Sequence, residues 1–264
     1  ISMEEPSLRA GGYDEDRFDR SKRIGWLDMD AVSSANVLVV GAGALGNEVV
    51  KDLMLSGVRR ITLVDMDYVV SSNLNRCLFF RPQDATSRRM KAEIVAERAA
   101  ELYPECDITP WIGRVEDMPF PWEGFDIALG CLDNIMARLH VNAHAYHSRI
   151  PFVDGGTDGF HGKVQTVHPP NGPCLQCGMN GSHQQVLQKR FSCTGSDVSF
   201  FVPKMAAEIT TTSIIAAMQV REALKCLSQR EDLCLHHVCF YDGESGESMV
   251  LELEISEGCQ NHYD

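Results

Sequence analysis

Residues 36–65 read NVLVVGAGALGNEVVKDLMLSGVRRITLVD, and this stretch decides the fold. After Asn36, the next four residues are aliphatic and mostly β-branched, which predicts a buried strand at 36–40, and a second strand of similar character follows at 61–64. Between the strands, Gly41, Gly43 and Gly46 open a helix, so backbone N–H groups and the positive end of a helix dipole can face a phosphate. The stretch therefore predicts a strand, glycine turn, helix and strand that bind a nucleotide.

Asp65 ends the second strand about 20 residues beyond the glycines, where an acid binds ribose hydroxyls. These features alone also fit a dinucleotide-binding dehydrogenase. However, Asn73, Arg76 and Lys91 follow in quick succession. Hydride transfer needs no cations or carboxamides on the phosphates, whereas a triphosphate under attack needs its charge neutralised and its leaving group held. The polar residues therefore favour ATP over NAD.

A third hydrophobic strand is predicted at 125–130, and Asp133 follows it closely. The carboxyl ends of parallel strands meet at one edge of a sheet, which is where open α/β folds bind ligands. A carboxylate at that edge is well placed to hold Mg²⁺ beside the phosphates. Asp133 is therefore the magnesium candidate.

Strands and helices alternate along most of the chain. We predict strands at 36–40, 60–64, 107–111, 125–130 and 151–154, and helices at 44–56, 88–102, 134–148 and 205–228. This alternation predicts an α/β fold with a Rossmann-like, mainly parallel sheet and helices on both faces. Two late runs, at 237–241 and 249–255, alternate in polarity and predict antiparallel strands at an edge.

The composition fits a single α/β domain. The chain has 264 residues, of which 44% are hydrophobic, enough for a large core. A formal net charge of −13 disfavours nucleic acid and anionic membranes as partners. No apolar run approaches a membrane span of about 20 residues, and no basic-then-apolar signal peptide is evident. We expect one cytoplasmic domain over 1–264, divided into an arm (1–35), a nucleotide-binding core (36–177), an embedded loop (178–204) and a C-terminal part (205–264).

Ten cysteines are present, and a chain of this length and fold favours free thiols and metal ligands over disulfides. Cys174 and Cys177 form one CxxC pair, and Cys259 and His262 repeat its spacing. Together the two pairs suit a closed, tetrahedral zinc knuckle. The alternative is that two pairs so far apart in the sequence share this spacing by coincidence. Six others lie in or beside apolar runs and are interpreted as small core residues: Cys77, Cys106, Cys131, Cys226, Cys234 and Cys239.

These motifs together resemble the ThiF/MoeB and ubiquitin-activating enzyme superfamily, whose members use ATP to adenylate the C-terminal glycine of a ubiquitin-fold protein. The resemblance runs from about residue 17 to residue 262. It implies ATP, Mg²⁺ and a structural Zn²⁺ as cofactors, and a ubiquitin-like protein with a C-terminal glycine as partner. Its compact length resembles the smaller activating enzymes.

The resemblance also implies roles for single residues. It matches Gly41, Gly43 and Gly46 to the nucleotide loop, Asp65 to the ribose-binding acid with Asp67 beside it, Asn73, Arg76 and Lys91 to the triphosphate contacts, and Asp133 to the magnesium-binding catalytic acid. The segment before Lys91 is slightly longer than usual, which leaves Arg89 as the alternative phosphate contact. Members usually carry two CxxC pairs, so His262 stands in place of a cysteine.

Two further catalytic residues follow from the resemblance. A cysteine just before the long helix at 205–228 takes the activated protein as a thioester, and Cys193 matches it, with Lys189 and Arg190 nearby to favour a thiolate. In an RFDR element at 17–20, Arg20 reaches into the neighbouring subunit of a homodimer and contacts the γ-phosphate.

We therefore predict an enzyme that adenylates a ubiquitin-like protein and transfers it to Cys193, with a conjugating enzyme as the next partner. One alternative is a sulfur-carrier adenylyltransferase of the ThiF/MoeB type that stops at the acyl-adenylate, with Cys193 idle or forming a persulfide. A non-catalytic scaffold subunit is a second alternative. The complete set of Arg20, Arg76, Lys91 and Asp133 argues against the scaffold.

Overall fold

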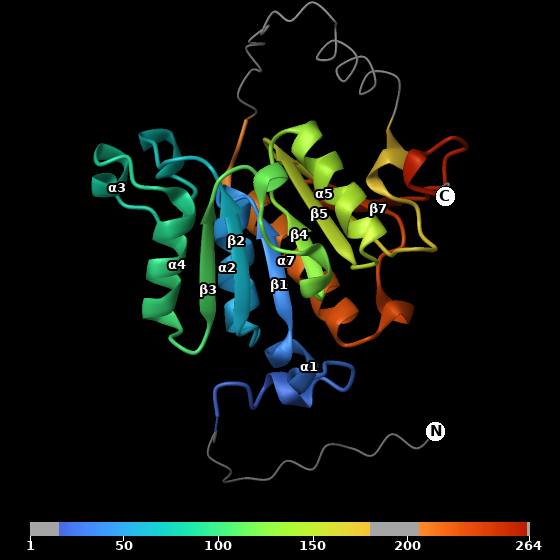
Figure 1. The fold of residues 1–264 in the computed structure, drawn as a ribbon, viewed down its shortest axis with the longest axis horizontal. Helices are drawn as coiled ribbons and strands as arrows, with labels where there is room; N and C mark the ends of the chain where they lie inside the picture. Colours follow the sequence, from blue (N-terminus) through green and yellow to red (C-terminus); the bar gives the residue numbers. More distant parts are fainter. Residues whose placement is uncertain (1–15, 180–205, 263–264) are drawn as a thin grey trace, which may run out of the picture.

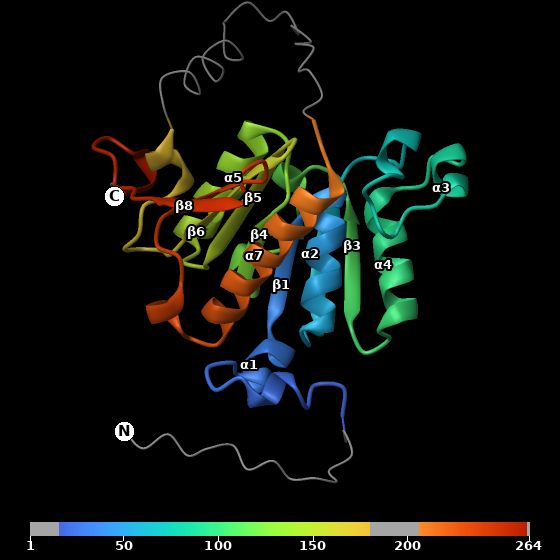
Figure 2. The same cartoon turned by 180° about the vertical axis from the view of Figure 1, so that it is seen from behind.

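A single sheet in the order β3-β2-β1-β4-β5-β6-β7-β8 crosses the computed structural model, which describes residues 16–179 and 206–262 (Figures 1 and 2). The strands are β1 (Asn36–Val40), β2 (Arg60–Asp65), β3 (Asp107–Ile112), β4 (Ile127–Gly130), β5 (Phe152–Asp158), β6 (His161–Val167), β7 (Val238–Asp242) and β8 (Glu247–Leu251). The first five strands are parallel, and β6 to β8 continue the sheet in antiparallel pairing.

Helices cover both faces of this sheet. The α-helices among the described residues are α1 (Met29–Ser34), α2 (Ala44–Leu55), α3 (Pro82–Thr86), α4 (Lys91–Leu102), α5 (Ile135–His147) and α7 (Ile209–Leu227). Figure 1 shows α5 in front of the sheet, and Figure 2 shows α2 and α7 packed side by side on the opposite face. The predicted Rossmann-like architecture with antiparallel edge strands is confirmed.

The β1 sequence shows why helices are needed on both faces. Val37 and Val39 pack into a core shared with α2, α4 and α7, whereas Leu38 and Val40 pack into a second core shared with α5. All four side chains are at most 1% exposed. An uninterrupted apolar run is therefore what a strand covered on both sides requires.

The structure corrects four predicted boundaries. The predicted strand at 151–154 continues to Asp158, and the predicted helix at 205–228 begins at Ile209. The predicted helix at 88–102 begins at Lys91, because Arg88 has a left-handed φ of 50° and turns the chain between α3 and α4. The predicted strand at 249–255 ends at Leu251, because beyond it the Leu253 N–H donates to the His237 Nδ1 at 3.1 Å. Among the described residues, no helix is both long and apolar enough to cross a membrane.

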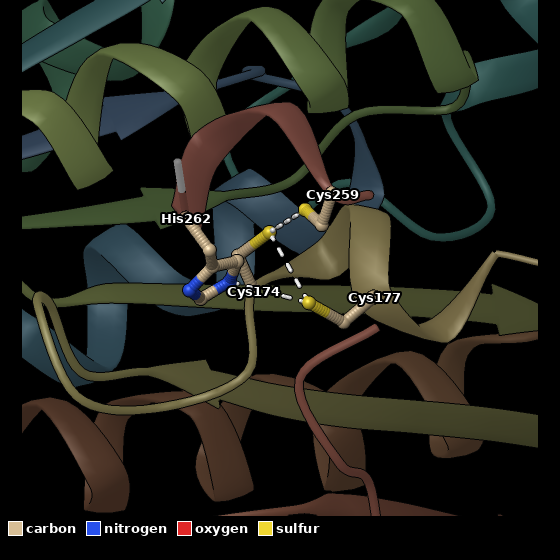
Figure 3. A group of neighbouring side chains, drawn as sticks. All are labelled: Cys174, Cys177, Cys259 and His262. Carbon is tan, nitrogen blue, oxygen red and sulfur yellow. Dashed lines mark hydrogen bonds between the residues drawn. The ribbon is translucent and has the colours of Figure 1, made fainter. Parts of the chain in front are cut away.

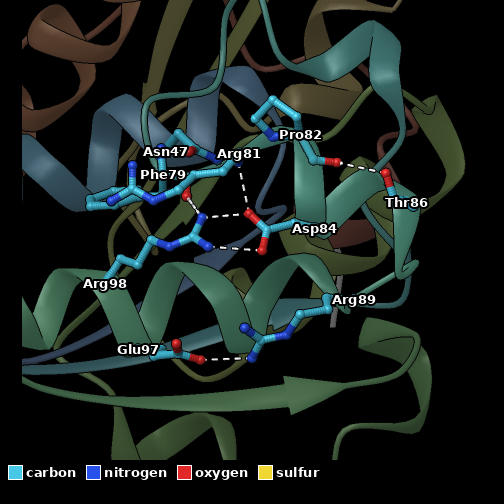
Figure 4. Close-up of polar contacts among 9 residues, drawn as sticks. All are labelled: Asn47, Phe79, Arg81, Pro82, Asp84, Thr86, Arg89, Glu97 and Arg98. Atoms are coloured by element: carbon cyan, nitrogen blue, oxygen red, sulfur yellow. Dashed lines mark hydrogen bonds and ion pairs between the residues drawn. The ribbon is translucent and has the colours of Figure 1, made fainter.

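A buried ion pair anchors the connection between β2 and α4 (Figure 4). The Arg98 guanidinium donates to both carboxylate oxygens of Asp84, at 2.5 and 2.8 Å, and also to the Phe79 carbonyl. Asp84 is 0% exposed and Arg98 is 7% exposed. Burial alone would raise the pKa of Asp84, but hydrogen bonds from Arg98 and from the Arg81 N–H hold that pKa below its usual value. The carboxylate therefore stays charged inside the protein.

We expect Arg98→Leu to lower the free energy of unfolding by about 3–5 kcal/mol, because it leaves the buried Asp84 carboxylate without a countercharge. Arg89→Leu is the matched control, since the Arg89–Glu97 pair spans 2.6 Å between side chains that are 39% and 50% exposed. An exposed pair of this kind contributes at most about 1 kcal/mol. Urea denaturation measures both variants, and equal losses would contradict a structural role for the buried pair.

Candidate functional site

The glycine turn between β1 and α2 is packed too tightly for side chains at two of its three glycines. Gly41 has a φ of 104°, and a Cβ there would lie 2.4 Å from the Cys131 carbonyl oxygen. A Cβ on Gly46 would lie 1.9 Å from the Gly41 carbonyl oxygen. Gly43 is the N-cap of α2, and no atom lies within 4 Å of the position of its Cβ. The first N–H groups of α2 thus face an open approach suited to an anion.

Asn47 fixes this turn from inside the protein. Its Nδ2 donates to the Ala42 and Gly43 carbonyl oxygens, both at 2.9 Å, and its Oδ1 accepts from the Phe79 N–H at 3.0 Å. The side chain is fully buried. The role of Asn47 was not predicted from the sequence, because no local pattern indicates a partner as distant as Phe79.

Asp65 holds the same turn from the end of β2. Its Oδ2 accepts from the Ala42 N–H at 2.7 Å, and its Oδ1 accepts from the Asp67 N–H at 2.8 Å. Burial raises the pKa of Asp65, an effect opposed by the charge of Lys91. The predicted ribose-binding acid is thus fixed beside the glycine turn.

Lys91, the first residue of α4, lies against these carboxylates. Its Nζ donates to the Asp67 Oδ2 at 2.8 Å, and its side chain is 12% exposed. Burial would lower the pKa of Lys91, but the carboxylates of Asp65 and Asp67 raise it above its usual value. Arg89 instead pairs with Glu97 at 2.6 Å. The structure thus places Lys91, rather than Arg89, next to Asp65.

Asn73 and Arg76 lie in the turn that follows β2. The Asn73 Oδ1 accepts from the Val70 N–H at 3.1 Å, which shapes the 3₁₀ turn Ser71–Asn73. The Arg76 Nη1 donates to the Asn75 Oδ1 at 2.9 Å and to a backbone carbonyl. Arg76 forms no ion pair with any carboxylate in the described part of the chain, so its charge can serve an anionic ligand.

Asp133 is exposed in the turn between β4 and α5. Arg138 holds this turn, since its Nε donates to the Leu132 carbonyl at 2.9 Å and its Nη1 donates to the Asp154 Oδ2 at 2.7 Å. Asp154 is 1% exposed; burial raises its pKa, and the charge of Arg138 opposes that effect. The ion pair therefore orients the turn that carries Asp133.

The four predicted metal ligands meet on the far side of the sheet from α2 (Figure 3). The Cys174 Sγ lies 3.9 Å from the Cys177 Sγ and 3.6 Å from the Cys259 Sγ, and the Cys177 Sγ lies 3.2 Å from the His262 Nε2. Thiolates bound to one tetrahedral zinc at 2.3 Å are roughly 3.8 Å apart. The positions of the four side chains therefore fit a closed, tetrahedral zinc site.

Tyr146 in α5 sets the orientation of His262. The Tyr146 hydroxyl donates its one proton to the Pro170 carbonyl. It must therefore accept the hydrogen bond from the His262 Nδ1, which lies 2.8 Å away. The Nδ1 therefore carries the imidazole proton, and the Nε2 presents its lone pair to the three sulfurs. Metal-bound histidines are commonly fixed in this way by a second hydrogen bond. No sequence pattern marks Tyr146 as a partner of His262, because the two residues are far apart along the chain.

A sequence profile of the ThiF family matches residues 18–261, which is nearly the whole chain. The chain belongs to the ThiF family. A NEDD8-activating enzyme E1 catalytic subunit from Arabidopsis thaliana is 37% identical over 155 residues, covering 53% of this chain and 34% of the relative. One with the same description from Dictyostelium discoideum is 32% identical over 201 residues, covering 70% and 45%. The chain thus spans less than half the length of these curated relatives.

Solved structures place this ThiF-family chain in the same fold. Escherichia coli MccB has a TM-score of 0.76 at 18% identity, covering 96% of this chain and 74% of MccB. The structure described as E. coli MccB with ATP has a TM-score of 0.75 at 18% identity, covering 96% and 76%. At this identity, the likeness shows the fold alone.

One predicted catalytic residue, Arg20, is not brought to the glycine turn of its own chain. Arg20 lies beside η1 (Ser21–Arg23), on the α1 side of the sheet, where β1 begins rather than where it ends (Figure 1). Its side chain is 79% exposed, with its Nε 3.9 Å from the Asp19 carboxylate. Any contact between Arg20 and a nucleotide therefore requires a second copy. Cys193 lies outside the described residues, and its role stays a prediction.

We expect Gly46→Ala to lower the thermal unfolding midpoint of the nucleotide-free protein, because its Cβ would overlap the Gly41 carbonyl oxygen. Overpacking of this kind costs roughly 1–3 kcal/mol. Gly43→Ala is the matched control and should leave the midpoint unchanged, since its Cβ meets no atom within 4 Å. Scanning calorimetry provides the measurement. Equal unfolding midpoints for the two variants would contradict the inference that tight packing of the turn requires glycine at position 46.

We expect Tyr146→Phe to weaken Zn²⁺ binding by roughly 10–100-fold, because the His262 Nδ1 loses its partner and the imidazole loses its fixed orientation. Competition with a colorimetric chelator measures the affinity. Tyr241→Phe, on β7 and outside the cluster, serves as the control. Unchanged zinc retention in Tyr146→Phe would show that the hydroxyl does not orient a metal ligand.

Proposed function

We propose that this protein uses ATP to adenylate the C-terminal glycine of a ubiquitin-like protein. One observation carries the proposal: the glycine turn, Asp65 and the charged Lys91 are held together at the carboxyl edge of the parallel strands. The ThiF profile and relatives named as NEDD8- and SUMO-activating enzyme subunits support it. So does the fold shared with MccB, of which one solved structure is described with ATP.

In this proposal the nucleotide lies along the carboxyl edge of the sheet. The ribose hydroxyls bind Asp65, and the phosphates lie over the glycine turn and the N-terminus of α2. Asn73, Arg76 and Lys91 contact the triphosphate. Asp133 would hold Mg²⁺, an ion that carboxylates bind beside phosphates and that neutralises part of their charge. The exposed position of Asp133 at this edge fits that role.

The first step is the transfer of a nucleotidyl group, AMP, from ATP to a carboxylate. The terminal carboxylate oxygen of the partner attacks the α-phosphorus of ATP. The bond between the α-phosphorus and the oxygen that bridges to the β-phosphate then breaks, and pyrophosphate leaves. Negative charge grows on the phosphate oxygens in this step, and Arg76 and Lys91 are positioned to stabilise it. The product is an acyl-adenylate, which keeps the carboxyl group activated.

Transfer to Cys193 is the second proposed step. Its thiolate attacks the acyl carbonyl carbon, a thioester forms, and AMP leaves. Lys189 and Arg190 support this role, since nearby cations favour a thiolate. A conjugating enzyme would then receive the partner. The alternative remains a sulfur-carrier adenylyltransferase that stops at the acyl-adenylate.

We also propose a homodimer in which Arg20 of each copy contacts the γ-phosphate bound by the other. The exposed side chain of Arg20, at the end of the sheet opposite to the glycine turn, supports action on another copy. A structural Zn²⁺ at Cys174, Cys177, Cys259 and His262 completes the proposal. Four protein ligands leave no open position for chemistry, so this ion would tie the C-terminal segment to the body of the protein.

ATP–pyrophosphate exchange in the presence of a ubiquitin-like protein tests the first step. We expect Asp133→Asn to reduce exchange by roughly 10²–10³-fold, a loss typical of removing one transition-state electrostatic contact. Asp107→Asn, at the amino end of β3, is the control and should retain exchange. Cys193→Ala should also retain exchange but lose a reductant-sensitive conjugate on a gel.

The outcomes separate the alternatives. Exchange without a conjugate in the unmodified protein would favour the sulfur-carrier function over thioester formation. Exchange that survives Asp133→Asn would contradict the proposed magnesium site. Tight binding of NAD in place of ATP would contradict the adenylation proposal and would favour a dehydrogenase function.

A further inference from the structure

Two cysteines and a histidine converge at the C-terminal end of α7, apart from the Cys174 cluster. Cys226 lies in the last turn of α7, Cys234 follows the 3₁₀ turn Glu231–Leu233, and His168 directly follows β6. One ligand atom from each of the three lies within 4.8 Å of the others. Both cysteines were predicted to be core residues, because they lie in or beside apolar runs of the sequence.

The distances suit a metal better than they suit a covalent bond. The Cys226 and Cys234 Sγ atoms are 3.7 Å apart. Two thiolates on one tetrahedral zinc are roughly 3.8 Å apart, whereas a disulfide requires about 2.05 Å. The separation also matches the values of 3.6 and 3.9 Å between sulfurs of the Cys174 cluster.

The histidine carries an independent signal. The His168 Nε2 is buried, yet it makes no hydrogen bond within the described residues. A buried nitrogen without a partner costs free energy, and such groups are uncommon in native structures. A metal bound through this nitrogen would give it a partner.

His236 lies beside His168, although it is not one of the three residues whose ligand atoms lie within 4.8 Å of one another. The ring centroids of His168 and His236 are 5.0 Å apart, and the His236 Nε2 lies 3.0 Å from the Glu231 carbonyl oxygen. A carbonyl can only accept, so this Nε2 carries the proton and the Nδ1 keeps its lone pair. His236 is exposed, so a water can fill the fourth position of a tetrahedral site.

We propose that His168, Cys226 and Cys234 form a second metal site, which binds Zn²⁺. A mixed set of thiolates and imidazole is the usual ligand set of zinc in proteins. The site would join the end of β6 to both ends of the turn between α7 and β7. His168 also precedes the Cys174–Cys177 pair closely in sequence, so the two ions would hold the two ends of segment 168–177.

Removal of this metal should leave the chain folded, because another contact holds the same turn. The Glu222 carboxylate accepts from the Leu235 N–H at 2.7 Å and from the Lys225 Nζ at 2.6 Å. These bonds use no atom of the proposed ligands. Single ligand variants can therefore be compared as folded proteins, which circular dichroism checks.

The zinc content of protein purified under reducing conditions, measured by mass spectrometry of the metal, tests the site. We expect about two ions per chain in the unmodified protein and about one in Cys226→Ser, Cys234→Ser and His168→Gln. Cys239→Ser replaces a buried cysteine of β7 that is not in the group and should keep both ions. Cys177→Ser, in the first cluster, should lose the other ion and keep this one.

Cobalt substitution gives a second readout. Co²⁺ bound by thiolates shows a sulfur-to-metal absorption band, and the part of that band that survives in Cys177→Ser should vanish when Cys226→Ser is added. A metal content that is the same in the unmodified protein, Cys226→Ser and His168→Gln would overturn the proposal. So would a peptide crosslinked by a disulfide between Cys226 and Cys234 in the reduced preparation.

Discussion

The edge that carries the candidate nucleotide residues depends on one close approach inside the glycine turn. A Cβ on Gly46 would lie 1.9 Å from the Gly41 carbonyl oxygen, so α2 can start directly after β1 only if that side chain is absent. This contact sets the direction of the first N–H groups of α2. Asn47 and Asp65 then hold the turn from opposite sides, since one bonds the Ala42 carbonyl and the other bonds its N–H. Both backbone polar groups of one residue, Ala42, are thus held by side chains from two elements that are separate in sequence.

Buried polar side chains extend this order to the loop after β2. Asn47 also binds the Phe79 N–H, Arg98 binds the Phe79 carbonyl, and the Arg98–Asp84 pair holds the chain just beyond it. The segment that carries Arg76 is therefore anchored a few residues away by groups that water does not reach. A charged side chain on a loop is only as well positioned as the backbone that carries it. These buried contacts therefore help to position the Arg76 charge. Each polar group is paired, which avoids the cost of an unsatisfied buried donor or acceptor.

Local sequence patterns were sufficient for the parallel half of the sheet and for the first metal cluster. The apolar run of β1 and the glycines after it specify their structure within a few residues, and equal spacing marked the pairs at Cys174 and Cys259. Contacts made by the fold alone left no such mark. Tyr146 meets His262, and His168 meets two cysteines, across long stretches of chain whose spacing carries no information. The start of α4 was misplaced for a similar reason, because the left-handed turn before it contains no glycine or proline.

Helix α7 runs from the segment that pairs with Gly159 to the N-terminal arm that carries Arg20. Its first turn follows the segment that pairs with Gly159 beyond β5, and at its other end the Ser228 hydroxyl accepts from the Asp28 N–H at 3.1 Å. That bond ties the arm that carries Arg20 to the last turn of α7, two residues beyond Cys226. An arginine that acts on another copy must be held firmly by its own chain, since a mobile side chain would lose binding free energy to ordering. A metal at Cys226 would stiffen the helix end to which the arm is bonded, and so would support the surface from which Arg20 would reach a second copy in the proposed homodimer.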